Sequence, residues 1–260
     1  MVVADLHVHT DNSDGTLTLE TLPAAAERAG LSAVAVTDHD RLHPELPTPV
    51  ADIGGLTVVH GIELRVEVDA DFRIDLLAYG ARRTDELLAL VERLQTDRIE
   101  RGRAIIDRVE NRLGVELPIE PRAGIGRPHI ASAIADATEL SVEDAFAELI
   151  GDDCPCYVAR DVPSFEEGRR ILESACGLVG LAHPLRYDDV DAALSLCADL
   201  DAVERFYPYE RSVDHRPIDR VIERYDLVAT GGSDAHDETL GRAGLDLEQY
   251  RRFRSSLTVG

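Results

Sequence analysis

The chain has 260 residues, 44% of them hydrophobic, so it is long enough to fold as one large domain with an ample core. Fifty acidic residues against 27 basic ones give a formal net charge of −23. This excess disfavours an extended electropositive surface for long nucleic acid. No apolar run approaches the roughly 20 residues that a membrane span needs, so we expect no membrane partner.

All 27 basic residues are arginine, because the sequence contains no lysine. An acidic, lysine-free surface stays hydrated, and its self-repulsion is screened, in a salt-rich cytoplasm. This composition predicts a protein from a halophilic source. The first residues show no signal-peptide pattern, so we also expect a cytoplasmic protein. Reduced thiols are expected at all four cysteines, although the first two could form half of a metal clip. The cysteines are Cys154, Cys156, Cys176 and Cys197.

The first eighty residues alternate between strand and helix patterns. A helix is expected from Thr18 or Thr21 to Gly30, since glycine commonly follows the last helical residue. Short strands separated by helices favour an α/β fold with a parallel sheet and helices outside. The runs with strand character are residues 2–9, 31–40, 56–64 and 72–79.

From Thr84 the pattern becomes helical only. Apolar residues at helical spacing predict a long amphipathic helix from Thr84 to Gly114. Shorter helices follow near 129–140 and 142–150. We interpret residues 83–160 as an inserted helical subdomain within a domain made of residues 1–82 and 161–260. After the insert, a helix from Ser164 to Gly177 precedes strand-like runs at 176–184, 201–208 and 226–236.

Histidine and carboxylate residues gather where the expected strands end. His7 and His9 lie two residues apart on one strand, so their side chains point to the same face. Strand ends meet at one edge of an α/β fold, and one site assembled from several strands is expected there. The other candidates are Asp14, His39, Glu63, His183, Asp234 and His236.

Mixed imidazole and carboxylate ligands suit Zn²⁺, Mn²⁺ or Fe²⁺, and eight ligands are too many for one ion. Two or three divalent metal ions are therefore expected. Such ions lower the pKa of a bridging water toward ~7 and clamp the oxygens of a transferring phosphoryl group. The expected nucleophile is a metal-bridged hydroxide, with no dedicated side-chain nucleophile.

The motifs DLHVHTDNSDG, VTDHD, GIE, AHP and GGSDAH resemble, in order, those of the polymerase and histidinol phosphatase (PHP) family. GRPHIA, CYVARDVPSFEE, AHPLRY and VATGGSDAHD are similar to stand-alone members that include nucleoside 3′,5′-bisphosphate phosphatases. The resemblance covers nearly the whole chain. It implies a distorted (β/α)7 barrel with a small helical insert, a trinuclear site and hydrolysis of phosphate monoesters. Some members also degrade short RNA from its 5′ end.

The resemblance also implies how the ligands divide among the metals. One ion would be held by His7, His9, Glu63 and Asp234, and Glu63 would bridge to a second ion shared with His183. Asp14, His39 and His236 would hold the third. In this subgroup a histidine usually follows GIE in the next strand, where this chain has Asp75. We expect Asp75 to coordinate the second ion and to make that position favour Mn²⁺ or Mg²⁺. The alternative is that the second ion is held only weakly.

In a lysine-free chain, phosphate recognition falls to arginine, histidine and backbone amides. Arg127 and His129 lie at an expected helix start, where an anion is favoured. The resemblance implies that this segment faces the metals. Arg186, which follows His183, and Arg160 are further candidates for binding the substrate.

These observations predict a phosphoesterase that acts on a phosphomonoester of a small nucleotide, such as a nucleoside 3′,5′-bisphosphate, or on the 5′ end of a short oligonucleotide. One alternative is a histidinol-phosphate or other small-molecule phosphatase. Another is a PHP module that binds metal without catalysis. Loss of several ligands would mark that last alternative, but only Asp75 deviates.

The composition itself generates a prediction about salt. We expect the midpoint of thermal unfolding to rise between low and molar KCl, because salt screens the repulsion among 50 carboxylates. Circular dichroism melting curves would measure the midpoints. Greater stability in low salt would contradict a halophilic origin.

Overall fold

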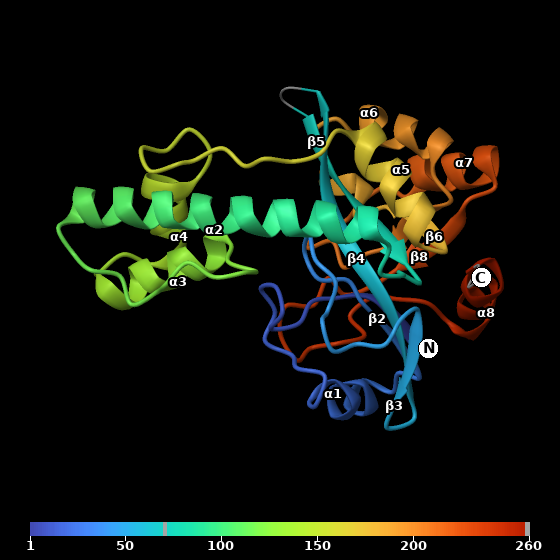
Figure 1. The fold of residues 1–260 in the computed structure, drawn as a ribbon. Helices are drawn as coiled ribbons and strands as arrows, with labels where there is room; N and C mark the ends of the chain where they lie inside the picture. Colours follow the sequence, from blue (N-terminus) through green and yellow to red (C-terminus); the bar gives the residue numbers. More distant parts are fainter. Residues whose placement is uncertain (70–71, 258–260) are drawn as a thin grey trace. The chain divides into compact units, whose positions relative to one another are not determined.

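The computed structural model describes residues 1–69 and 72–257, and the chain divides into two compact units. The first consists of Met1–Ala89 and Pro163–Gly260, and the second of Leu90–Val162. A curled sheet with helices on its outside makes up the first unit (Figure 1). Its strands are β1 (Ala4–Val8), β2 (Ala33–Val36), β3 (Val50–Ile53), β4 (Leu56–Asp69), β5 (Phe72–Tyr79), β6 (Leu178–Leu181), β7 (Ala202–Phe206) and β8 (Val228–Gly231).

Seven strands of this sheet follow the order β1-β2-β4-β5-β6-β7-β8, and β3 pairs with β4. The first and last strands approach each other just past their ends. There, Ala235 forms a parallel bridge with Val8, and its carbonyl accepts a hydrogen bond from the backbone N–H of His9 at 2.9 Å. The chain segments that follow β1 and β8 are thereby held side by side. The expected α/β class is confirmed.

The expectation of a parallel sheet is wrong in part. β5 runs antiparallel to both β4 and β6. The pairs β1–β2, β2–β4, β6–β7 and β7–β8 are parallel. Only residues 70–71 separate β4 from β5, and a parallel pairing would need a crossover of a dozen residues or more. The strand expected at 56–64 therefore continues to Asp69, and Glu63 lies within β4 rather than at its end.

The sequence analysis missed β3, which forms an antiparallel hairpin with β4. Gly54 and Gly55 make the two-residue turn with φ values of 63° and 88°. Positive φ at both central residues suits the right-handed twist of a hairpin and favours glycine. The Gly-Gly pair between two apolar runs was therefore the signal for this strand.

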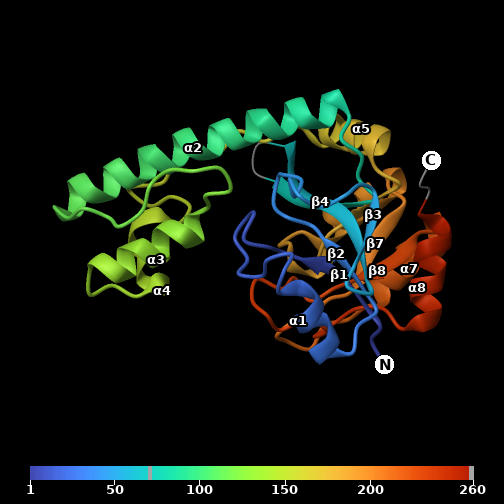
Figure 2. The ribbon, with the colours of Figure 1, turned by 60° about the horizontal axis from the view of Figure 1, so that its bottom comes forward.

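Helices cover the outside of the sheet in the first unit (Figure 2). α1 ends as expected, with Gly30 in the left-handed region at φ 70°. α5 begins at the expected cap, where the Ser164 hydroxyl accepts a hydrogen bond from the Glu167 N–H. The helical segments are α1 (Leu22–Ala29), α5 (Phe165–Ala175), η2 (Pro184–Arg186), α6 (Val190–Ser195), η3 (Leu196–Asp199), α7 (Arg216–Tyr225) and α8 (Leu247–Ser256).

The second unit is helical. The long helix expected between Thr84 and Gly114 is present as α2 (Asp85–Leu113), and α3 (Arg127–Ala137) follows it. The expected helix at 142–150 forms as α4 (Val142–Ala145), which continues as the wider turn η1 (Phe146–Ile150). The cluster of buried side chains in this unit includes Ile105, Val109, Ile130, Ile134 and Leu149. An inserted subdomain with the limits 83–160 stays a prediction.

All four cysteines are free thiols, and three of them are buried. Burial raises the pKa of Cys176 and of Cys197 to about 12, so both stay protonated at neutral pH. Among the described residues, the groups able to hold a metal contain no cysteine, which leaves the metal-clip alternative for Cys154 and Cys156 without support. No described helix has the length and apolar character needed to cross a membrane.

Candidate metal centre

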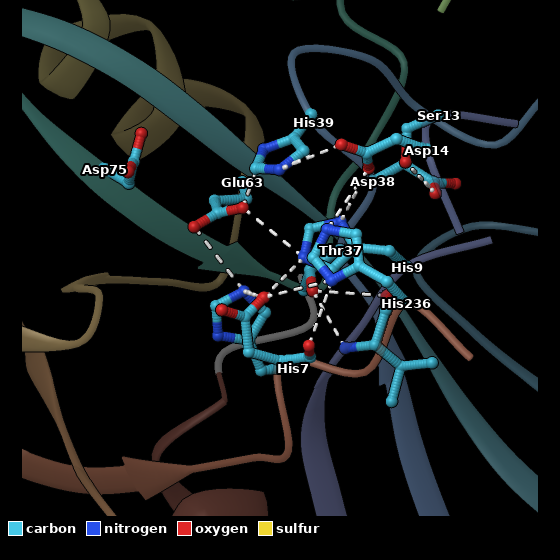
Figure 3. A network of polar contacts seen from close by, with 12 residues as sticks. His7, His9, Ser13, Asp14, Thr37, Asp38, His39, Glu63, Asp75 and His236 are labelled. Carbon is cyan, nitrogen blue, oxygen red and sulfur yellow. Dashed lines mark hydrogen bonds and ion pairs between the residues drawn. The ribbon is translucent and has the colours of Figure 1, made fainter. Parts of the chain in front are cut away.

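All eight candidates from the strand ends, together with Asp75, lie in the first unit. They come from the end of β1 and the segment after it, from the segments that follow β2, β6 and β8, and from within β4 and β5. Two of them occupy tight backbone turns, since His183 has φ 27° and Asp234 has φ 51°. Non-glycine residues rarely adopt positive φ, and such conformations cluster at functional sites. Figure 3 shows the side chains of His7, His9, His39 and Glu63 directed toward one another.

The carboxylate of Glu63 lies at the centre of the group and is almost fully buried. Its Oε1 is 3.1 Å from His183 Nε2 and 3.5 Å from His7 Nε2. Its Oε2 is 2.8 Å from His39 Nδ1 and 3.4 Å from His9 Nε2. One carboxylate therefore faces four imidazoles from three different segments, those at the ends of β1, β2 and β6. A carboxylate in this position would suit the role of a metal ligand at the centre of the group.

Asp234 completes a first ligand group with the pair on β1. Its Oδ1 lies 3.4 Å from His7 Nε2 and 3.1 Å from His9 Nε2. The backbone behind this pair is tightly packed: a Cβ at Gly232 would lie 2.3 Å from the backbone nitrogen of His7. Only glycine allows this close approach, which accounts for the second glycine of GGSDAH.

A second ligand group lies on the other side of His9. His39 Nε2 is 3.7 Å from Asp14 Oδ2, and His236 Nε2 is 3.3 Å from Asp14 Oδ1. His9, Asp14, His39 and His236 each offer one atom within 4.8 Å of the others. The structure therefore brings together the three residues that the resemblance implies for the third metal.

Glu63, Asp75 and His183 form a third group within the same distance. His183 Nε2 is 3.7 Å from Asp75 Oδ2. The Asp75 carboxylate already forms a two-pronged ion pair with Arg65, at 2.8 Å from Nε to Oδ1 and 2.6 Å from Nη2 to Oδ2. Coordination of a metal by Asp75 stays a prediction, and the sequence analysis did not anticipate its arginine partner.

The donor set fits divalent metal ions. His7 Nε2 and His9 Nδ1 are buried and have no hydrogen-bond partner within the described part of the chain. Buried nitrogens without partners are costly unless a ligand satisfies them. Imidazole nitrogens and carboxylate oxygens at these spacings suit Mn²⁺, Zn²⁺ or Fe²⁺. The histidine and carboxylate ligands expected from the sequence therefore have the spacing that a cluster of ions requires.

The electrostatics of the group favour positive charge at its centre. Burial disfavours the cation of His7, but Glu204, Asp234 and Glu63 outweigh it and raise the pKa of His7 well above its ordinary value. Burial likewise opposes ionisation of Glu63, yet the neighbouring His39 and His7 hold the pKa of this carboxyl well below its usual range. The cluster thus stabilises ionised carboxylates around a cationic centre.

Glu204 supports the centre from behind and was missed by the sequence analysis. It is fully buried in β7, with Oε1 3.0 Å from His7 Nδ1. Its Oε2 accepts a hydrogen bond of 2.7 Å from the backbone N–H of His183. A hydrogen on His7 Nδ1 directs the Nε2 lone pair into the cluster, as is typical of metal-bound histidine. The only signal was an acidic residue inside an apolar strand, VERF.

Two other buried carboxylates hold the loops that carry the ligands. Asp38 accepts hydrogen bonds from the backbone N–H of Thr10 at 2.8 Å and from the Ser13 hydroxyl at 2.7 Å, which orders the loop before Asp14. Asp5 accepts one from the Ser233 N–H at 2.8 Å and so fixes the segment that precedes Asp234. These aspartates act by positioning the loops.

Among the predicted substrate-binding residues, Arg186 lies beside the centre. Its Nη1 is 3.2 Å from Asp234 Oδ2 and 3.0 Å from the hydroxyl of Tyr207, which also donates to Asp234 at 2.9 Å. Asp234 therefore turns one oxygen to the histidines and the other to Arg186 and Tyr207. Tyr207 was not anticipated.

Arg127, His129 and Arg160 belong to the second unit. Arg127 and His129 lie at the start of α3, as expected, but both take part in local contacts. The guanidinium of Arg127 lies 2.9 Å from Asp152, and His129 Nδ1 accepts a hydrogen bond from the Gly126 N–H at 3.0 Å. Substrate binding by these three residues stays a prediction.

Comparison with known proteins identifies the class. The sequence profile of the PHP domain matches residues 5–120. This match covers the segments that supply His7, His9, Asp14, His39 and Glu63. The match over residues 5–120 confirms the resemblance to the PHP family seen in the motifs.

Several relatives extend the match over most of the chain. The phosphoribosyl 1,2-cyclic phosphate 1,2-diphosphodiesterase of Eggerthella lenta is 28% identical over 90% of this chain and 94% of its own length. The 3′,5′-nucleoside bisphosphate phosphatase of Chromobacterium violaceum is 26% identical over 95% and 91%. A Bifidobacterium adolescentis structure, described as a metal-dependent phosphoesterase, is 27% identical, with a TM-score of 0.79, and the match covers 99% of this chain and 97% of that one. The expectation of a hydrolase of phosphoric ester bonds is confirmed at this level.

The position of Glu204 generates a prediction about metal affinity. Glu204→Gln keeps the shape of the side chain but removes the charge that supports His7, so we expect Mn²⁺ to bind ~10- to 100-fold more weakly. Isothermal titration of the metal-free protein would measure the affinity. Glu223→Gln, at an exposed position of the same unit, is the matched control. Equal affinity in both variants would contradict the supporting role of Glu204.

Proposed function

We propose that this chain hydrolyses a phosphomonoester of a small nucleotide, such as a nucleoside 3′,5′-bisphosphate, or of a short oligonucleotide at its 5′ end. We further propose that its curled sheet is a distorted (β/α)7 barrel whose inner edge carries the ligands. The observation that carries the proposal is the convergence of four histidines on the buried Glu63 carboxylate. A cluster of divalent ions suits phosphoryl chemistry, because it can clamp both the attacking and the leaving oxygen.

Divalent ions held by these residues would lower the pKa of a water and neutralise charge on the phosphoryl oxygens. In the proposed hydrolysis a water oxygen would form the new bond to phosphorus, and the ester oxygen would leave with a proton. The chain's own part is to hold the ions and to orient the substrate. Arg186 is placed for orientation, because its guanidinium and the hydroxyl of Tyr207 meet beside Asp234. A guanidinium also suits a phosphate that carries several acceptor oxygens.

The names of two relatives point to the same kind of substrate. One acts on a phosphoribosyl cyclic phosphate and the other on a nucleoside bisphosphate. Both compounds are pentoses that carry two phosphoryl groups. Likeness to a 5′-3′ exoribonuclease of Salmonella typhimurium, 29% identical over 72% of this chain and 67% of its own length, supports the nucleotide alternative. We therefore propose a pentose with two phosphoryl groups as the substrate class.

A cavity beside the centre can receive the group that does not react. Its volume is about 580 Å³, and it includes Asp234, a ligand candidate, in its lining. Two tyrosine rings in the lining, with centroids 4.8 Å apart, offer an aromatic surface to a sugar or base. Three arginines supply positive charge for a phosphate. These residues are Arg186, Arg211 and Arg242, with Tyr207 and Tyr209.

The test is a panel of substrates with Mn²⁺-loaded protein. We expect phosphate release from 3′-phosphoadenosine 5′-phosphate to exceed release from AMP and from histidinol phosphate. Phosphoribosyl 1,2-cyclic phosphate forms a further arm, favoured by the relative from Eggerthella lenta. No hydrolysis of any member of the panel by protein whose metals are verified would overturn the proposal and leave the metal-binding module as the alternative.

Single substitutions test the assigned ligands. His9→Ala and Asp234→Ala each remove a candidate ligand atom of the first ligand group, His9 Nε2 or Asp234 Oδ1, so we expect both to abolish phosphate release. Circular dichroism would check that the fold is retained. Asp199→Ala, at an exposed position away from the centre, should keep full activity. Unchanged activity in either ligand variant would contradict the assignment.

A further inference from the structure

The three ligand groups differ in what already neutralises their carboxylates. Both oxygens of Asp75 are engaged by Arg65, through two contacts of 2.8 Å and 2.6 Å. Asp234 also contacts an arginine, but only through Oδ2, and its Oδ1 faces the histidines. Of the three ligand groups, only that of Glu63, Asp75 and His183 contains a carboxylate whose two oxygens both pair with an arginine.

The ion pair between Arg65 and Asp75 is fixed by the sheet. The two residues are direct partners in the antiparallel register of β4 and β5, so their side chains rise side by side from one face. The backbone on both sides is held as well. The Arg65 N–H donates to Asp40 Oδ1 at 3.1 Å, and the Asp75 N–H binds the hydroxyl of Tyr187 at 2.9 Å. Asp75 is only 2% exposed, so water does not compete for its oxygens.

A buried, two-pronged arginine–carboxylate pair is strong and geometrically specific. Breaking it to free the Asp75 oxygens would give up two short charge-assisted hydrogen bonds to an almost fully buried carboxylate, which is costly. A divalent ion between Glu63, Asp75 and His183 would also lie close to the guanidinium and be repelled by it. In the other two ligand groups, no described arginine pairs with the carboxylate oxygens that face the histidines, so neither a broken ion pair nor a nearby guanidinium opposes metal binding there.

We propose that Arg65 takes the place of one metal ion, so that the centre binds two divalent ions tightly rather than three. One ion is held by the group of His7, His9, Glu63 and Asp234, and the other by the group of Asp14, His39 and His236. The guanidinium held by Asp75 supplies a permanent positive charge on the remaining side of Glu63. Its exposed part, 40% of the side chain, is available to a phosphoryl oxygen of the substrate. That the centre binds divalent ions at all rests on the proposed function. The number of ions is inferred from the ion pair of Arg65 and Asp75.

Counting the ions tests this inference without reference to activity. Metal-free protein would be dialysed against excess Mn²⁺, freed of unbound ions by gel filtration, and analysed by inductively coupled plasma mass spectrometry. We expect two ions per wild-type chain. Arg65→Gln frees the Asp75 carboxylate and should raise the number to three.

The matched control is Arg73→Gln. Arg73 lies in the same hairpin and forms a cross-strand ion pair with Glu67 at 2.8 Å, outside the ligand groups. Its substitution should leave two ions. Three ions on the wild-type chain would overturn the inference even if Arg65→Gln fails to fold, and so would a folded Arg65→Gln that still holds two. Two ions without phosphate release from any substrate would overturn the proposed function and leave this inference standing.

Discussion

The burial of the Glu63 carboxylate among four imidazoles is the constraint on which the rest of the site depends. An ionised group without water is costly unless cations or hydrogen bonds surround it. The sheet meets this demand by curling, which brings the segments after β1, β2, β6 and β8 to the middle of β4. Glu204 and Asp38 then fix the rings and loops, so that the nitrogen lone pairs point inward.

Positive charge is distributed unevenly over this acidic chain. The net charge of −23 disfavours polyanions in general, yet Arg186, Arg211 and Arg242 line one cavity and Arg65 pairs with Asp75 beside the candidate metal ligands. A small phosphorylated compound can enter such a local region, whereas a long nucleic acid would face the acidic surface. The composition and the site therefore favour the same kind of substrate.

Much of the site follows from the sequence because strand ends in α/β folds share an edge. His7, His9, His183 and Asp234 could be placed together by this rule alone. The positions of Glu63 and Asp75 do not follow from this rule, since both residues lie within the antiparallel hairpin of β4 and β5 rather than at strand ends. Cross-strand partners such as Arg65 depend on register, which local patterns do not determine. Glu204 could not be recognised either, because a single acidic residue in a strand forms no motif with other residues at a defined spacing.

The central claim is that the buried Glu63 carboxylate binds a metal ion at the centre of the site, and one measurement tests it most directly. A crystal structure of the Mn²⁺-loaded protein, with anomalous differences collected at the manganese edge, would locate each ion. The account predicts two peaks, one within coordination distance of Glu63, His7, His9 and Asp234 and the other within coordination distance of Asp14, His39 and His236. Peaks that leave both oxygens of Glu63 without a metal would contradict the account.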